Sequence, residues 1–161
     1  MGTIDKIKQA ISEAFDSETE IVWKKDNSGW VGYFAIDGVR YKMNMELDDE
    51  KVDNFNVWMF KFFYWNGTRW STELTKNNKP FSVFGAIRKG IFEFFDEVKP
   101  DVFLFIGDEY RDSLYKKLYT ILAMQKHYGF LDDIKRFVYL LMSDNVHAKT
   151  IEKLKEKVML F

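Results

Sequence analysis

Apolar side chains recur at steps of three and four residues at the start of the chain, which is the spacing of one helix face. They are Ile4, Ile7, Ile11 and Phe15. Thr3 stands directly before this stripe, where its hydroxyl can cap the first helical turn. The pattern predicts an amphipathic helix over residues 1–15 that packs on the rest of the fold.

Two alternating runs meet at Asp37-Gly38, a strong signal for a two-residue hairpin turn. The turn sets a register, and the expected cross-strand pairs are Ile36 with Val39, Phe34 with Tyr41, Gly32 with Met43, and Trp30 with Met45. These residues share one apolar face. The opposite face carries Tyr33, Ala35, Arg40, Lys42, Asn44 and Glu46. We therefore expect an antiparallel hairpin with one face on the core and the other in solvent.

The segment 55–65 is apolar at both odd and even positions, apart from Asn56 and Lys61. Such a segment is either an interior strand covered on both faces or a strand whose second face awaits a partner. The sequence leaves both alternatives open. Asn66-Gly67 then predicts a turn toward residues 68–70.

From Pro80 onward the spacing of apolar residues becomes helical, and Lys99-Pro100 ends the predicted helix. Residues 102–106, VFLFI, are continuously apolar and predict a buried central strand. A further helix follows, with Asp108 or Asp112 as its cap and Gly129 suited to its C-terminal end. Its inward residues are Leu114, Leu118, Ile121 and Leu122.

The segment 131–142 fits two structures. Ile134, Val138 and Leu141 have helical spacing, whereas KRFVYLLM also fits a strand, and we favour the strand. A closing helix is expected over 145–161. The order of elements predicts a single α+β domain over 1–161, a mixed and mostly antiparallel sheet with flanking helices, whose sheet-and-helix body spans 20–142.

Composition narrows the function classes. The chain has 161 residues, 24 basic and 25 acidic side chains and a net charge of −1. This balance disfavours binding of nucleic acid mainly by phosphate neutralisation, although a local patch stays open. The absence of cysteine excludes disulfides and thiolate zinc sites, and with only His127 and His147 we expect no metal site. No segment resembles a signal peptide or a membrane span, so a cytoplasmic protein without membrane contact is expected.

The helix LYKKLYTILAMQKHYGF over 114–130 ends in Gly129-Phe130 ahead of a candidate strand. This ending and the element order resemble the back half of the GCN5-related N-acetyltransferase fold. The resemblance implies a GNAT-like topology, acetyl-CoA as cofactor and a pyrophosphate loop at 77–82. Its candidate cofactor residues here are Lys79, Ser82 and Gly85.

The chain departs from that family at two places. The corresponding stretch, 77–86, lacks the family's glycine pattern, since its single glycine, Gly85, lies inside the predicted helix. Gln125 occupies the position of the family's general-acid tyrosine, and Tyr119 lies more than a turn earlier. The resemblance therefore implies a fold more than an activity.

A second resemblance is to small uncharacterised proteins of large tailed bacteriophages. It rests on Lys99-Pro100-Asp101, the segment VFLFIGDE over 102–109, and Leu114-Tyr115. It implies a viral accessory or virion protein, located in the host cytoplasm or in the virion. It does not imply a chemical reaction.

Catalytic motifs of zinc hydrolases, serine hydrolases and phosphate-loop enzymes are absent from the sequence. Asp108 and Glu109 follow the buried strand, where α/β-type sheets often place sites, and with Tyr119 they are the catalytic candidates. The competing interpretation is that Asp108 caps the next helix.

Aromatic residues make up 18% of the chain. The partner-binding candidates are Trp58, Phe60, Phe62, Tyr64 and Trp70. Core packing of the strand positions is the alternative, and base stacking another, with Lys61 and Arg69 as the nearby cations. The leading hypothesis is a non-enzymatic binding or assembly protein with a protein partner or self-association. An acyl-CoA-dependent N-acyltransferase is the alternative, and single-stranded nucleic-acid binding the third.

Overall fold

The computed structural model describes residues 19–72 and 80–161. The helix predicted over 1–15 and the candidate Lys79 lie outside the described residues. No helix within the described ranges combines the length and apolar character needed to cross a membrane.

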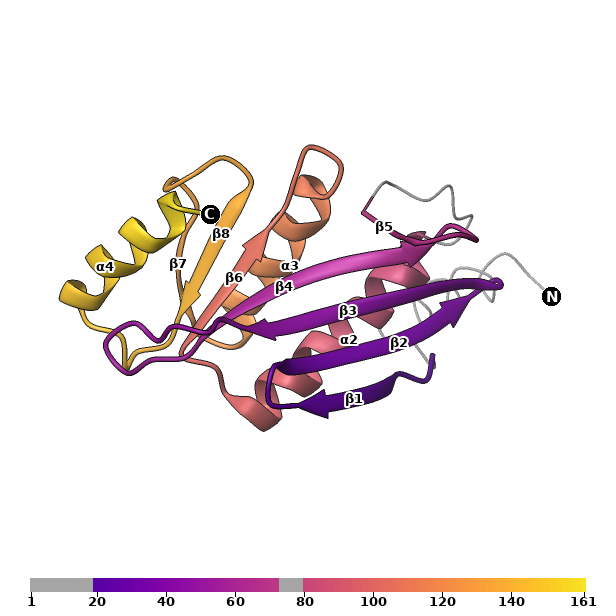
Figure 1. The fold of residues 1–161 in the computed structure, drawn as a ribbon, viewed down its shortest axis with the longest axis horizontal. Helices are drawn as coiled ribbons and strands as arrows, with labels where there is room; N and C mark the ends of the chain where they lie inside the picture. The colour runs from indigo at the N-terminus through magenta and orange to yellow at the C-terminus, as the bar shows by residue number, and fades with distance from the viewer. Residues whose placement is uncertain (1–18, 73–79) are drawn as a thin grey trace.

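One eight-stranded sheet runs through the described residues in the order β1-β2-β3-β4-β6-β8-β7, and β5 pairs with β4 off this path (Figure 1). Its strands are β1 (Val22–Asp26), β2 (Gly29–Ile36), β3 (Val39–Leu47), β4 (Val57–Trp65), β5 (Trp70–Ser71), β6 (Val102–Ile106), β7 (Gly129–Leu131) and β8 (Val138–Met142). The helices are α2 (Pro80–Val98), α3 (Asp112–Gln125) and α4 (Ala148–Met159). The expected α+β class and mostly antiparallel sheet are confirmed.

The hairpin β2–β3 has the predicted register. Ile36 pairs with Val39, and the pairing continues in step to Trp30 with Met45. Asp37 and Gly38 have φ of 52° and 77°. Positive φ at both central residues is the turn geometry that matches the twist of antiparallel strands, which is why Asp-Gly favours it.

Strands β4 and β6 form a parallel pair within the otherwise antiparallel sheet. They are in register from Val57 with Val102 to Phe60 with Phe105. A parallel pair needs a crossover connection, and α2 supplies it. Beyond this pairing β4 continues to Trp65, and there its neighbour is the short strand β5.

The ambiguous segment 131–142 contains a strand, β8, so the strand preference is confirmed at 138–142. The role predicted for Gly129 is wrong. α3 ends at Gln125, His127 takes the left-handed conformation with φ 59°, and Gly129 opens strand β7. The chain therefore turns two residues earlier than the glycine suggested.

The two faces of the sheet bury separate apolar clusters. On one face, α2 and α3 pack on side chains from β2, β3, β4, β6 and β8. On the other, Leu154 and Val158 of α4 pack on Val57 and on the alternate residues of β6 and β8. Figure 1 shows α4 at the β7–β8 end of the sheet and α2 behind β2–β4. Hence β6 is buried on both faces, as its apolar run predicted.

Candidate functional site

The even-numbered residues of β4 face the helix-covered side of the sheet. Phe60 and Phe62 are 0% and 1% exposed, and Trp58 and Tyr64 pack against the same cluster. The Phe60 ring contacts those of Phe103, Phe105 and Tyr115. Phe60 and Phe62 are thus core residues, and their rings are inaccessible to a partner.

The odd-numbered residues of β4 face the opposite side, and beyond Met59 they are Lys61, Phe63 and Trp65. Register places Phe63 beside Lys42 of β3, and Lys42 beside Tyr33 of β2. Trp70 of β5 pairs with Trp65. No described helix covers this part of the face. We call it the open face, and it carries Lys24, Tyr33, Arg40, Lys42, Lys61, Phe63, Trp65 and Trp70.

The rings of the open face gather around one lysine. Lys42 Nζ lies 4.8 Å from the centroid of Trp70 and 5.0 Å from that of Phe63. The Trp70 ring is 5.4 Å from Trp65 and 6.1 Å from Tyr33. Tyr33 and Trp70 come from strands separated by β3 and β4, so these contacts join four strands into one aromatic cluster.

Two further cations flank this cluster. Lys24 Nζ lies 5.5 Å from the Tyr33 ring, and the Arg40 guanidinium lies 5.2 Å from the Trp65 ring. A cation over an aromatic face is attracted by the negative electrostatic potential of the ring. The rings therefore hold the three cations Lys24, Arg40 and Lys42 along a band from β1 to β5.

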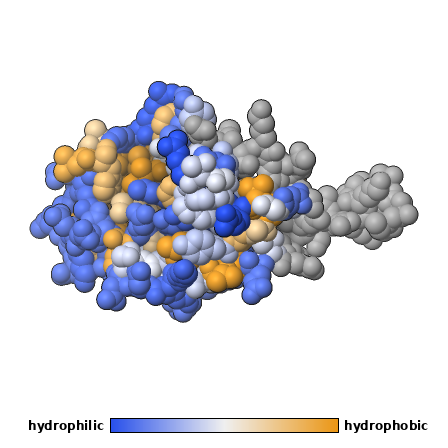
Figure 2. All heavy atoms as spheres, turned by 45° about the vertical axis from the view of Figure 1, so that its right-hand side comes forward, coloured by the Kyte–Doolittle hydropathy of each residue, from blue (hydrophilic) through white to orange (hydrophobic). Residues whose placement is uncertain are grey.

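Carboxylates are scarce on the open face. Glu46 forms an ion pair with Lys61, in which Glu46 Oε2 lies 3.7 Å from Lys61 Nζ. Among the described residues, no carboxylate forms an ion pair with Lys24, Arg40 or Lys42. Figure 2 shows hydrophobic residues in separate patches among hydrophilic ones on one side of the molecule. The open face therefore combines half-buried rings with an excess of positive charge.

The sequence contained a signal for this face. The hairpin pattern already set Tyr33, Arg40 and Lys42 on its polar side. What was missing was the register of β3 on β4, which puts Lys42 beside Phe63 and supplies the cations that the segment 55–65 lacks by itself. Of the predicted partner-binding residues, Trp70 lies on the open face.

The carboxylates after β6 have separate surroundings. Asp108 Oδ1 accepts hydrogen bonds from the backbone N–H groups of Tyr110 and Arg111, both at 2.9 Å. Asp108 therefore closes the turn before α3 and is not the helix cap that the sequence predicted, because the N-cap of α3 is Arg111, without a side-chain capping hydrogen bond. Glu109 is exposed.

Tyr119 lies in another environment. Its hydroxyl donates to Asp132 Oδ2 at 3.0 Å, and its ring stacks on Tyr139 with centroids 4.6 Å apart. Burial, and then the bond to Asp132, raise the pKa of Tyr119. No described contact joins Tyr119 to Asp108 or Glu109, so the three catalytic candidates do not form one site.

The space beside β4 beyond its pairing with β6 is filled by two polar side chains. The Tyr115 hydroxyl accepts a hydrogen bond from the Phe62 N–H at 3.2 Å, and the Arg111 guanidinium lies 4.9 Å from the Phe62 ring. Both residues are buried. Burial raises the pKa of Tyr115 and lowers the pKa of Arg111. This end of the parallel pair is packed as core.

The candidate cofactor residues within the described ranges are Ser82 and Gly85. Both are buried inside helix α2. Ser82 is 8% exposed. These two positions belong to the packed part of the helix rather than to an exposed anion-binding loop.

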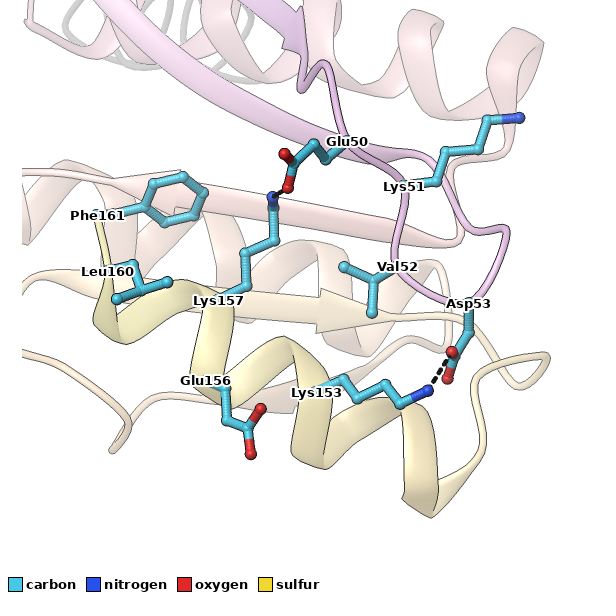
Figure 3. Close-up of a pocket in the computed structure, with 9 residues that line it drawn as sticks. All are labelled: Glu50, Lys51, Val52, Asp53, Lys153, Glu156, Lys157, Leu160 and Phe161. Atoms are coloured by element: carbon cyan, nitrogen blue, oxygen red, sulfur yellow. Dashed lines mark hydrogen bonds and ion pairs between the residues drawn. The ribbon is translucent and has the colours of Figure 1, made fainter.

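A cavity of about 540 Å³ lies between α4 and the loop that joins β3 to β4 (Figure 3). Lys153 Nζ lies 2.5 Å from Asp53 Oδ1. Lys157 Nζ lies 3.3 Å from Asp48 Oδ1 and 3.9 Å from Glu50 Oε2. Hydrogen bonds from Lys153 and Thr150 lower the pKa of Asp53. These pairs join α4 to the loop.

No three His, Asp or Glu side chains within 19–72 and 80–161 are grouped to hold a metal ion. Comparisons of the chain with protein-family models, with curated proteins and with solved structures find no match. The functional assignment therefore rests on the geometry of the chain itself.

Proposed function

We propose that this chain is a non-enzymatic binding protein whose ligand surface is the open face, and that its ligand is an extended anion. The observation that carries the proposal is the set of three cations, Lys24, Arg40 and Lys42, held over aromatic rings without a carboxylate partner among the described residues. The proposal keeps an aromatic binding surface, but it lies on the odd-numbered side of β4 and not on the even-numbered side that the sequence suggested.

The arrangement supports a ligand role for a physical reason. Rings on an open sheet face expose apolar area that a solvated surface does not need, and such patches commonly mark interaction sites. Cations held over rings are already ordered, so a ligand anion costs less side-chain entropy to bind than it would with mobile lysines. The face is thus preorganised for an anionic ligand.

The first test is binding of a generic polyanion, heparin, by the whole chain at increasing salt. Binding at low salt that weakens as salt rises is expected, because salt screens exposed charges beyond about 10 Å at 0.1 M. Lys42→Gln should weaken it several-fold, and Lys117→Gln, an exposed lysine on α3, is the matched control. Equal losses in both variants, or no binding at low salt, would contradict the proposal.

The acyltransferase alternative receives less support. This alternative rests on the resemblance of the element order along the chain to the acetyltransferase fold. However, Ser82 and Gly85 are buried in α2, and Tyr119 is bonded to Asp132. A ligand that binds only the folded state raises the melting midpoint. We expect millimolar acetyl-CoA to leave the midpoint unchanged, and an upward shift would restore this alternative.

A further inference from the structure

We infer that the anion bound by the open face is single-stranded nucleic acid, with its bases stacked on the aromatic cluster and its phosphates on the flanking cations. This inference rests on the proposed function and names its ligand. The stacking residues are Tyr33, Phe63, Trp65 and Trp70, and the phosphate-binding residues are Lys24, Arg40 and Lys42.

Rings and cations are interleaved across the strands of the open face. Lys24, then Tyr33, then Lys42 occupy β1, β2 and β3, and Phe63 follows on β4. Neighbouring strands lie about 4.8 Å apart, so Tyr33, Phe63 and Trp65 each have a cation on an adjacent strand. Trp70 on β5 contacts Lys42 across β4. A nucleic-acid strand likewise presents a base and a phosphate in every repeat.

Other ligands match only one of the two kinds of side chain on the open face. An acidic peptide or a sulfated sugar would use the cations but has no flat rings to place on Trp65 and Trp70. A hydrophobic protein partner would use the rings but would bury Lys42 and Arg40 without a counter-charge, which costs several kcal/mol per ion. A single strand is the ligand that satisfies both kinds of side chain.

A duplex does not offer its bases to the aromatic cluster. Bases in a duplex are stacked on each other, and their faces are not available to protein rings. The open face spans five strands, and is wider than the helix or two-stranded ribbon that the major groove admits. Stacking therefore requires a strand whose bases are unpaired, and stacking on aromatic residues tolerates every base.

The charge distribution supports a localised site. The open face holds four of the 24 basic residues of the chain and two of its 25 acidic residues, Glu46 and, at the end of β1, Asp26. The rest of the chain is therefore net acidic and repels phosphates. This explains how a chain with a net charge of −1 can bind a polyanion at one place, which overall composition alone disfavours.

The experiment compares two labelled probes by fluorescence anisotropy at low salt. One is an oligothymidine of about 12 nucleotides, and the other is an abasic strand of the same length, which keeps the phosphates and lacks the bases. The thymidine strand should bind the whole chain at least about 10-fold more tightly, because each stacked base adds to the affinity. A blunt duplex should bind more weakly than the thymidine strand.

Variants assign the effect to the rings. Trp65→Ala and Trp70→Ala should each weaken binding of the thymidine strand by about 5- to 100-fold and leave the abasic strand unchanged. Trp65→Phe, which keeps a ring, should restore most of the affinity. Phe130→Ala is the matched control, because Phe130 is an exposed aromatic residue on β7. An unchanged melting midpoint in each variant shows that the fold is retained.

Four outcomes would overturn the inference. Equal affinity for the thymidine and abasic strands would overturn stacking while leaving the anion-binding function in place. Tighter binding of the duplex would do the same. Equal affinity for polyglutamate would point to an acidic protein partner. No binding of either strand at low salt, together with no binding of heparin, would overturn both the inference and the proposed function.

Discussion

The face of the sheet opposite α2 and α3 has two halves of different chemistry. Over β6 and β8 it is aliphatic and buried under α4, with Val102, Leu104 and Leu140 at its centre. Over β1–β5 it carries rings and cations and no described helix lies on it. Strand β4 crosses from one half to the other, from Val57 to Trp65.

This comparison shows that apolar content does not identify a buried face. The odd-numbered positions of β4 are apolar at both ends, yet one end is core and the other is the open face. The difference lies in the residue type and its neighbours. Val57 meets aliphatic side chains and α4, whereas Phe63 meets Lys42, and a lysine ammonium stays near solvent because its burial without a partner is costly.

Adding a charge to the covered half, compared with removing one from the open half, should give the largest effect on the free energy of unfolding. Val57→Lys places an ammonium in a fully buried site, and we expect it to lower the free energy of unfolding by more than about 3 kcal/mol. Lys61→Val, on the same strand, should change it by less than about 1 kcal/mol. Urea denaturation measures both. Similar losses in the two variants would show that the halves do not differ.

Removing a side chain that packs α4 on the sheet should give the second-largest loss in the free energy of unfolding. Leu154 is fully buried between α4 and the sheet, so Leu154→Ala should cost about 2–5 kcal/mol in unfolding free energy. The matched change in the open half, Phe63→Ala, should cost less because Phe63 is only half-buried. Chemical denaturation of the two variants side by side tests this, and a greater cost for Phe63→Ala would refute the assignment of the open half.

A smaller effect is expected for the contact between Lys42 and Trp70. A double-mutant cycle with Lys42→Ala and Trp70→Ala should give a coupling energy of about 0.5–1 kcal/mol, the range of cation–π pairs at exposed sites. Additive losses would mean that the ring does not hold the lysine in solution. The preorganisation argued for the open face would then fail.

The smallest effect concerns acid stability in the covered half. The pKa of Asp53 is lowered in the folded state, so its stabilising contribution is fully present above the ordinary carboxyl pKa of about 4 and is lost as the pH falls through the folded-state pKa. The Asp53→Asn variant should therefore be less stable than the wild type at neutral pH. In acid the two proteins should have the same free energy of unfolding. Urea midpoints across that pH range measure this. Lys42→Gln in the open half should keep the wild-type acid dependence.

Local patterns in the sequence predicted much of the fold because they act over a few residues. Asp37-Gly38 determined the register of β2 on β3, and the VFLFI run marked β6 as buried. Gly129 was misassigned, because His127 adopts the left-handed conformation at the helix end instead. A glycine permits that conformation but does not require it.

The candidate site was only half predicted, and the reason is physical. The sequence by itself determined that residues 55–65 form a strand with apolar side chains on both faces, and that the hairpin has a mostly polar face. The tertiary structure decided which face of β4 is buried by α2 and α3. It also decided that β3 pairs with β4, which brings Lys42 to Phe63 and Trp70. Strand pairing and helix docking join residues far apart in the chain, and no local pattern encodes that choice.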